Sequence, residues 1–111
     1  MITDLKKLSQ ELDVDLVSGA VDEQSQDFPL LVPKSFVKRM GLKNLTDPLL
    51  SQVLPKKIEL EKVVGFSVDP IDEINRSPVH GLIHKYAGRI LLLVTNTCAI
   101  NCRFCFRRHL Q

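Results

Sequence analysis

Residues 88–109 read GRILLLVTNTCAINCRFCFRRH, a short apolar run followed at once by three cysteines. The run at residues 90–94 shows no alternation with polar residues. This favours a β-strand covered on both faces, as in a parallel sheet, with a buried helical turn as the alternative. Functional side chains follow the carboxyl ends of the strands in an α/β barrel, but a full barrel needs about 200 residues or more. With 111 residues, the chain is expected to be the front piece of a longer protein.

The three cysteines, Cys98, Cys102 and Cys105, are spaced Cys-x3-Cys-x2-Cys. An odd and tightly spaced set cannot form a self-contained disulfide framework, so a metal site or a reactive thiol is expected. Thiolates suit zinc or an iron–sulfur cluster. Three protein ligands on a four-iron cluster would leave one iron open. A closed zinc site with His109 as the fourth ligand and a loop without metal are the alternatives.

The composition is that of one small globular domain, with 44% apolar residues, 25% charged residues and a formal net charge of +2. This charge by itself demands neither nucleic acid nor an anionic membrane as a partner. No stretch approaches the roughly 20 apolar residues of a membrane span, and the N-terminus lacks the pattern of a secretory signal. Because reduced thiols fit the cytosol, we expect a cytoplasmic protein that binds no nucleic acid and no membrane.

Helix signals precede the apolar run. Leucines at helical spacing predict a helix through about residue 12, with Thr3 or Asp4 as its N-cap. The polar residues 17–26 predict a loop. Pro33 fits the first position of a second helix, which would continue to about residue 40.

Asp47 and Pro48 fit the N-cap and the first residue of a third, short helix. Glycines and prolines then predict that residues 55–88 are irregular. This segment is nevertheless expected to be ordered, because it contains apolar side chains that favour burial, namely Val63, Val64, Phe66, Val68, Ile71 and Ile74.

The cysteine spacing after a strand, with an aromatic residue at position 104, resembles the signature of the radical S-adenosylmethionine superfamily. Longer stretches are similar to lysine 2,3-aminomutases, and in particular to the bacterial subgroup that makes (R)-β-lysine for attachment to elongation factor P. The stretches are VPKSF at 32–36, DPLLSQVL at 47–54, GFSVDP at 65–70, PVHGLIHKYAGR at 78–89 and CAINCRFCFRRH at 98–109.

The resemblance implies an α/β fold in which a helical and irregular extension, residues 1–86, precedes the start of a truncated radical S-adenosylmethionine barrel, residues 87–111. It implies that the three cysteines bind a 4Fe–4S cluster whose open iron binds S-adenosylmethionine. Cleavage of that group gives a 5′-deoxyadenosyl radical, which acts on L-lysine held by pyridoxal 5′-phosphate. The cofactors supply the radical chemistry, and the protein positions them. A one-electron reductant such as flavodoxin or ferredoxin, and a homo-oligomer, are further implied partners.

The resemblance also assigns roles to five side chains outside the cysteines. Lys85, Tyr86 and Arg89 match positions that hold the phosphate of pyridoxal phosphate, with Lys85 in place of an arginine found in some relatives. Phe104 matches the residue beside the adenine, and Arg107 matches the arginine that receives the substrate carboxylate. Each assignment has a simpler alternative. Lys85 and Arg89 could be basic residues that snorkel from a loop, Phe104 could simply cover the cluster, and Arg107 could belong to a solvated basic run.

Two histidines, His80 and His84, receive no role. The lysine that forms the imine lies beyond the chain in this family, so no catalytic residue is expected here and the chain alone is expected to be inactive. The alternative functions are an aminomutase for another amino acid, such as glutamate, and a zinc-binding interaction module that uses His109.

Overall fold

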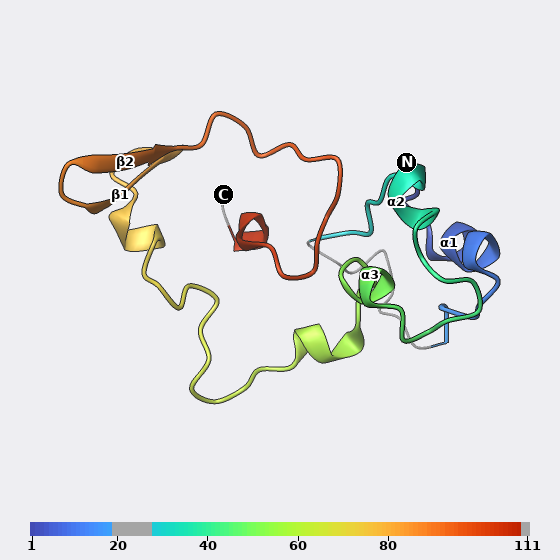
Figure 1. Ribbon diagram of the computed structural model, residues 1–111. Coiled ribbons are helices and arrows are strands. Elements are labelled where there is room, and N and C mark those ends of the chain that lie inside the picture. The colour runs from blue at the N-terminus through green and yellow to red at the C-terminus, as the bar shows by residue number, and fades with distance from the viewer. Residues whose placement is uncertain (19–27, 110–111) are drawn as a thin grey trace. The chain divides into compact units, whose positions relative to one another are not determined.

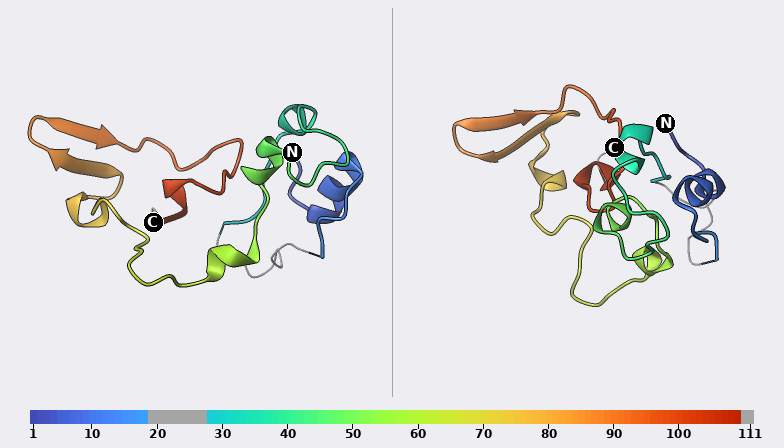
Figure 2. Two further views of the ribbon diagram at one scale, coloured as in Figure 1. Left: turned by 60° about the horizontal axis from the view of Figure 1, so that its bottom comes forward. Right: turned by 45° about the vertical axis from the view of Figure 1, so that its right-hand side comes forward.

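The structure is a computed structural model that describes residues 1–18 and 28–109. Contacts within the chain divide it into two compact units, traced in Figures 1 and 2. The helical unit comprises Met1–Glu61 and Cys98–Cys105, and the hairpin unit comprises Lys62–Thr97 and Phe106–Gln111. The cysteine loop therefore belongs to the helical unit. The division expected after residue 86 stays a prediction.

Helix α1 (Leu5–Leu12) confirms the predicted N-terminal helix. Asp4 is its N-cap, and its carboxylate accepts hydrogen bonds from the amides of Lys6 at 2.6 Å and Lys7 at 3.2 Å. Two of the first amides, which have no acceptor within a helix, are satisfied in this way. The helix ends at Asp13, which adopts a left-handed conformation with φ 53°.

Two further helices are short. Helix α2 (Lys34–Val37) ends earlier than predicted, and Pro33 is its N-cap and not its first residue. Helix α3 (Pro48–Ser51) begins as predicted, with Asp47 as its N-cap and a proline at its first position. Of the loop predicted at 17–26, all but the first two residues lie outside the described residues.

The carboxylate of Asp47 joins α3 to the turn that follows α2. One oxygen accepts hydrogen bonds from the amides of Leu49 at 2.8 Å and Leu50 at 3.0 Å, and the other accepts from the amide of Gly41 at 2.9 Å. These backbone donors, with the Gly41 amide first, hold the pKa of the Asp47 carboxyl below its usual value. The capping residue is therefore also a tertiary contact.

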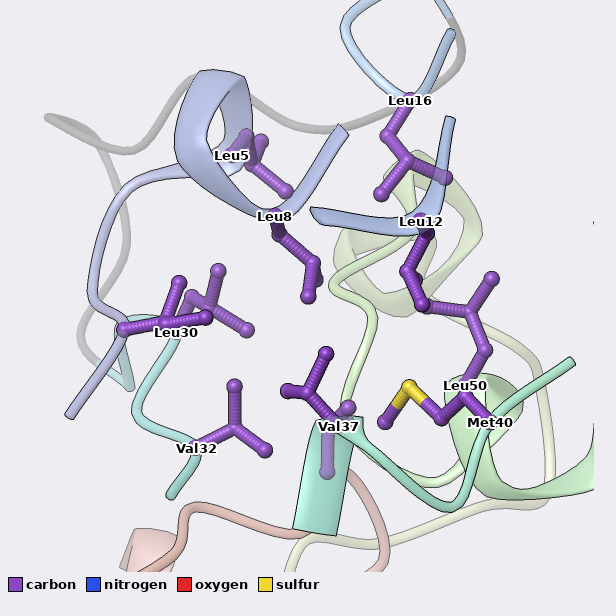
Figure 3. Close-up of a cluster of buried hydrophobic side chains, with 11 residues drawn as sticks. Leu5, Leu8, Leu12, Leu16, Leu30, Val32, Val37, Met40 and Leu50 are labelled. Atoms are coloured by element: carbon purple, nitrogen blue, oxygen red, sulfur yellow. The ribbon is translucent and has the colours of Figure 1, made fainter. Parts of the chain in front are cut away.

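The helical unit has one apolar core, shown in Figure 3. Leu8 and Leu12 of α1 point toward Val37 and Leu50 of the other two helices. The partly buried Ile100 packs against the same cluster, so the cysteine loop contacts the core. The buried members are Ile2, Leu5, Leu8, Leu12, Leu16, Leu30, Val32, Val37, Met40, Leu50 and Val53.

The hairpin unit contains the strand predicted in the apolar run, but its surroundings differ from the prediction. Strand β1 (Leu82–Tyr86) pairs antiparallel with β2 (Arg89–Leu92), and all four residues of β2 are exposed (Figure 1). Gly88, at φ +72°, allows the tight turn after β1 that brings β2 back alongside it. The described part of the chain therefore shows neither the expected parallel neighbour nor the expected cover on both faces.

The apolar side chains of segment 55–88, whose burial was the reason to expect an ordered segment, are exposed in the structure. The segment contains β1 and two 3₁₀ helices, η2 (Lys57–Leu60) and η3 (Ile74–Arg76). Another 3₁₀ helix, η4 (Phe106–His109), follows the cysteine loop. No described element covers the apolar side chains, and more than half of each is exposed, at Val63, Val64, Phe66, Val68, Ile71 and Ile74. None of the described helices has the length and apolarity that crossing a membrane requires.

Candidate functional site

The cysteine loop carries three free thiols. Cys98 is exposed, whereas Cys102 and Cys105 are partly buried. Three thiolates on one short loop are the right donors for a soft metal or an iron–sulfur cluster. Among the described residues, however, no three side chains of histidine, cysteine, aspartate or glutamate are gathered closely enough to hold a metal ion. The donor chemistry fits a cluster, and the loop would have to close around it.

Asn101 attaches the loop to the segment before α2. Its backbone amide donates to the carbonyl of Leu31 at 2.9 Å, and its side-chain amide donates to the carbonyl of Pro29 at 3.1 Å. The residue is only 9% exposed, so these bonds satisfy polar groups that water hardly reaches. The residue immediately before Cys102 is therefore fixed.

Arg103 attaches the other side of Cys102. Its backbone amide donates to the carbonyl of Gln52 at 2.7 Å, and its guanidinium Nη1 donates to the carbonyl of Phe28 at 2.8 Å. The remaining guanidinium nitrogens bind both carboxylate oxygens of Glu59, with an Nη2–Oε2 distance of 2.6 Å and Nε distances of 3.0 and 3.2 Å. This two-pronged pairing is the strong form of an arginine–carboxylate contact.

The Glu59–Arg103 ion pair is mostly shielded from water, because the two side chains are 17% and 9% exposed. Glu59 is held in turn by η2, where its carboxylate accepts from the amide of Lys56 at 3.0 Å. Neither Arg103 nor Glu59 stands out in the sequence. The local pattern around Lys56 indicates a helical turn, but nothing in it connects residue 59 with residue 103.

Phe104 shows no partner in the described structure. Its side chain is fully exposed, although in the sequence it lies between the partly buried Cys102 and Cys105. An aromatic ring in this position could cover a ligand or a cluster bound by the loop. Its expected role beside an adenine stays a prediction.

The three residues expected to bind a phosphate lie together at the end of the hairpin. Tyr86 is the cross-strand partner of Arg89. The guanidinium carbon of Arg89 lies 5.4 Å from the centre of the Tyr86 ring, and Nζ of Lys85 lies 5.9 Å from it. Two cations and a hydroxyl in one place are suitable for binding an anion.

Lys85 already has partners within the hairpin unit. Its Nζ donates to the carbonyl of Ile71 at 2.7 Å, and its charge also acts on Asp69. The pKa of the Asp69 carboxyl is below its usual value, chiefly because the amides of Glu73 and Ile74 donate to it, with a smaller contribution from Lys85. Lys85 therefore binds the chain before β1, whereas Tyr86 and Arg89 lie exposed at the end of the hairpin.

Arg107 lies in η4, where its Nη1 donates to the carbonyl of Asn96 at 2.9 Å. This contact connects η4 with the segment that follows β2, within the hairpin unit. The expected role of Arg107 in binding a substrate carboxylate stays a prediction.

The histidines remain without an assigned role. His80 lines a pocket of about 580 Å³ in the hairpin unit, together with Glu73, Ser77, Asn96 and apolar residues of both strands' flanks. His84 is exposed on β1. The side chain of His109 lies outside the described part of the structure, so the zinc alternative stays untested.

A loop of three free cysteines, anchored to a helical unit by its intervening residues, is typical of proteins that bind soft metals or iron–sulfur clusters. Sequence comparison gives the relatives. The chain is 46% identical over 98% of its length to the L-lysine 2,3-aminomutase of Escherichia coli K12, and 36% identical over 96% of its length to that of Bacillus subtilis 168. It is 51% identical over 74% of its length to the L-lysine 2,3-aminomutase of Buchnera aphidicola.

By sequence, the chain is thus homologous to the L-lysine 2,3-aminomutases. It spans 32% of the length of the Escherichia coli relative, 22% of the Bacillus relative and 24% of the Buchnera relative. No protein-family model matches the chain.

Proposed function

We propose that the chain is part of an L-lysine 2,3-aminomutase and contributes the three thiolates of its 4Fe–4S cluster. The observation that carries the proposal is the loop of free cysteines, in a chain homologous over nearly its whole length to proteins of that name. When bound, the cluster, S-adenosylmethionine and pyridoxal phosphate would supply the radical chemistry that isomerises lysine to β-lysine. The chain's own residues would bind and orient these groups.

In this proposal Cys98, Cys102 and Cys105 are the metal ligands. Cys102 is held by its two anchored neighbours, whereas Cys98 is exposed and would join it when the loop closes around the cluster. Phe104, fully exposed, would pack against the adenosyl group and exclude water. Three cysteine ligands bind three irons of a four-iron cluster and leave the fourth iron for a small molecule.

Arg89 and Tyr86 would bind the phosphate of pyridoxal phosphate, because both are exposed and lie together. Lys85 would contribute only after leaving the carbonyl of Ile71, and as a point charge it cannot form the two-pronged contact of an arginine. Arg107 would bind the substrate carboxylate. Both assignments rest on the resemblance and on the charge of the side chains.

The apolar, exposed β2 supports the proposal that residues 87–111 begin a barrel. A strand with leucine and isoleucine on both faces is normally covered on both sides, and relatives with several times this length have the residues to cover it. The further proposal is that the complete enzyme is cytoplasmic, uses a one-electron reductant such as flavodoxin or ferredoxin, forms a homo-oligomer and makes β-lysine for elongation factor P. The chain by itself is proposed to be inactive.

The test is anaerobic reconstitution of the chain with iron and sulfide. We expect about four irons per chain and a visible absorption that is lost in air, and we expect Cys98→Ser, Cys102→Ser and Cys105→Ser each to lose the iron. His109→Ala is the matched control, and it should retain the cluster. Stoichiometric zinc that depends on His109, or no iron at all, would refute the proposal.

A further inference from the structure

We infer that Glu59 and Arg103, with Asn101, form a clamp that holds Cys102 in place on the helical unit before any metal is bound. This clamp consists of the Glu59–Arg103 ion pair and the two hydrogen bonds of Asn101. These three residues would position the ligand Cys102 and would not bind the metal themselves. The inference rests on the proposed function only in regarding Cys102 as a ligand, since the clamp itself exists without metal.

The first observation is that the clamp surrounds Cys102 on both sides. Both neighbouring backbone amides are used, since Asn101 donates to Leu31 at 2.9 Å and Arg103 donates to Gln52 at 2.7 Å. With the residues before and after it fixed, the main chain of Cys102 has little freedom. The loop therefore does not have to order this ligand when a cluster forms, which lowers the entropy cost of binding.

The second observation is the shielding of the ion pair. At 9% and 17% exposure, the two charges are held apart from most water, so removing one of them leaves the other poorly solvated. The exposed pair between Lys43 and Asp13 of the same unit, at 3.1 Å with both side chains at least 70% exposed, has no such cost. That pair is a matched control.

The third observation is the number of bonds that meet at each charged group. The Arg103 guanidinium binds Glu59 and the carbonyl of Phe28, while the Glu59 carboxylate also caps η2 through Lys56. Segments near residues 28, 56 and 103 are thereby tied at one point, far apart in sequence. This contact is more than a local cap, because its loss would release the cysteine loop from the segments near residues 28 and 56 at once.

The test measures amide hydrogen exchange, by mass spectrometry, in the metal-free chain and its variants. In Glu59→Gln we expect residues 99–105 to exchange about tenfold faster or more, because a shielded charge loses its partner. Exchange in α1 is expected to stay unchanged, and Asp13→Asn is expected to change neither segment. Arg103→Lys, which keeps the charge but cannot bind both carboxylate oxygens, should give an intermediate rate.

Two results would overturn the clamp. One is unchanged exchange of residues 99–105 in both Glu59→Gln and Arg103→Lys. The other is an equal rise in α1 in both variants, which would show that the pair supports the whole unit and not the loop. Iron reconstitution of the same proteins separates this inference from the proposed function, with slower iron uptake expected in Glu59→Gln. If the wild-type chain binds no iron, but residues 99–105 exchange faster in Glu59→Gln than in wild type, the proposed function is refuted and the clamp is supported.

Discussion

Truncating Leu50 tests whether the helical core supports the cysteine loop. Leu50 lies in α3, is fully buried at 0% exposure, and packs in the same cluster that Ile100 contacts. Leu50→Ala removes three carbons, worth about 2.4 kcal/mol at about 0.8 kcal/mol for each buried CH₂. A residual cavity adds to this, so we expect a loss of about 3–4 kcal/mol in the free energy of unfolding.

Urea unfolding followed by circular dichroism measures this loss. A small domain has only about 5–15 kcal/mol of stability in total. At a urea m value of about 1–3 kcal/mol/M, this loss lowers the unfolding midpoint by about 1–4 M. The matched control is Leu42→Ala, the same chemical change at a side chain that is 68% exposed, for which we expect less than about 0.5 kcal/mol. A loss below about 1 kcal/mol for Leu50→Ala, or an equal loss for Leu42→Ala, would refute the core described here.

Three further changes probe local structure. The Leu93 amide donates to the Gly81 carbonyl at 2.7 Å, and Gly81→Ala should speed hydrogen exchange of that amide. Gly81 has φ +79°, and an added Cβ would lie 3.3 Å from the Leu93 carbonyl oxygen, so alanine is strained there. Unchanged exchange would contradict this strain. Asp47→Asn should lower the melting temperature at neutral pH because one capping oxygen is lost. Since the folded pKa of Asp47 lies below 3.8, its contribution is complete above that pH and is lost as the pH falls through the folded value, so the difference from wild type should shrink in acid and not grow. Asp4→Ala should cost about 1 kcal/mol in urea unfolding by removing the N-cap of α1, and no loss would count against the cap.

Local signals explain what the sequence predicts well. Asp4 and Asp47 are strong N-caps, and Pro48 fits the first turn of a helix, so α1 and α3 begin where the sequence indicates. These signals depend on neighbours within about four residues and need no knowledge of the fold. Pro33 shows the limit, because a proline can precede a helix as its N-cap as well as begin it.

The hairpin shows what local signals cannot settle. An apolar run such as residues 90–94 indicates that a strand prefers burial, but its neighbour and its cover come from other parts of the chain. Here the neighbour of β2 is β1, because the turn at Gly88 folds the two strands together, and no described element covers β2. The Glu59–Arg103 pair is a second case, since 44 residues separate its partners and nothing local announces it.

The cysteine loop therefore combines two requirements in eight residues. Cys98 and Phe104 are exposed, as a ligand and a cover for something bound would be, whereas Asn101 and Arg103 turn inward and are mostly buried. If the cysteines are the ligands proposed above, the residues between them are more than spacers, because Asn101 and Arg103 carry the contacts of the loop to the helical unit. A loop in which only the cysteines mattered would tolerate any residue between them. Because Asn101 and Arg103 use their backbone amides and their side chains together, the helical unit restricts which residues can stand on either side of Cys102.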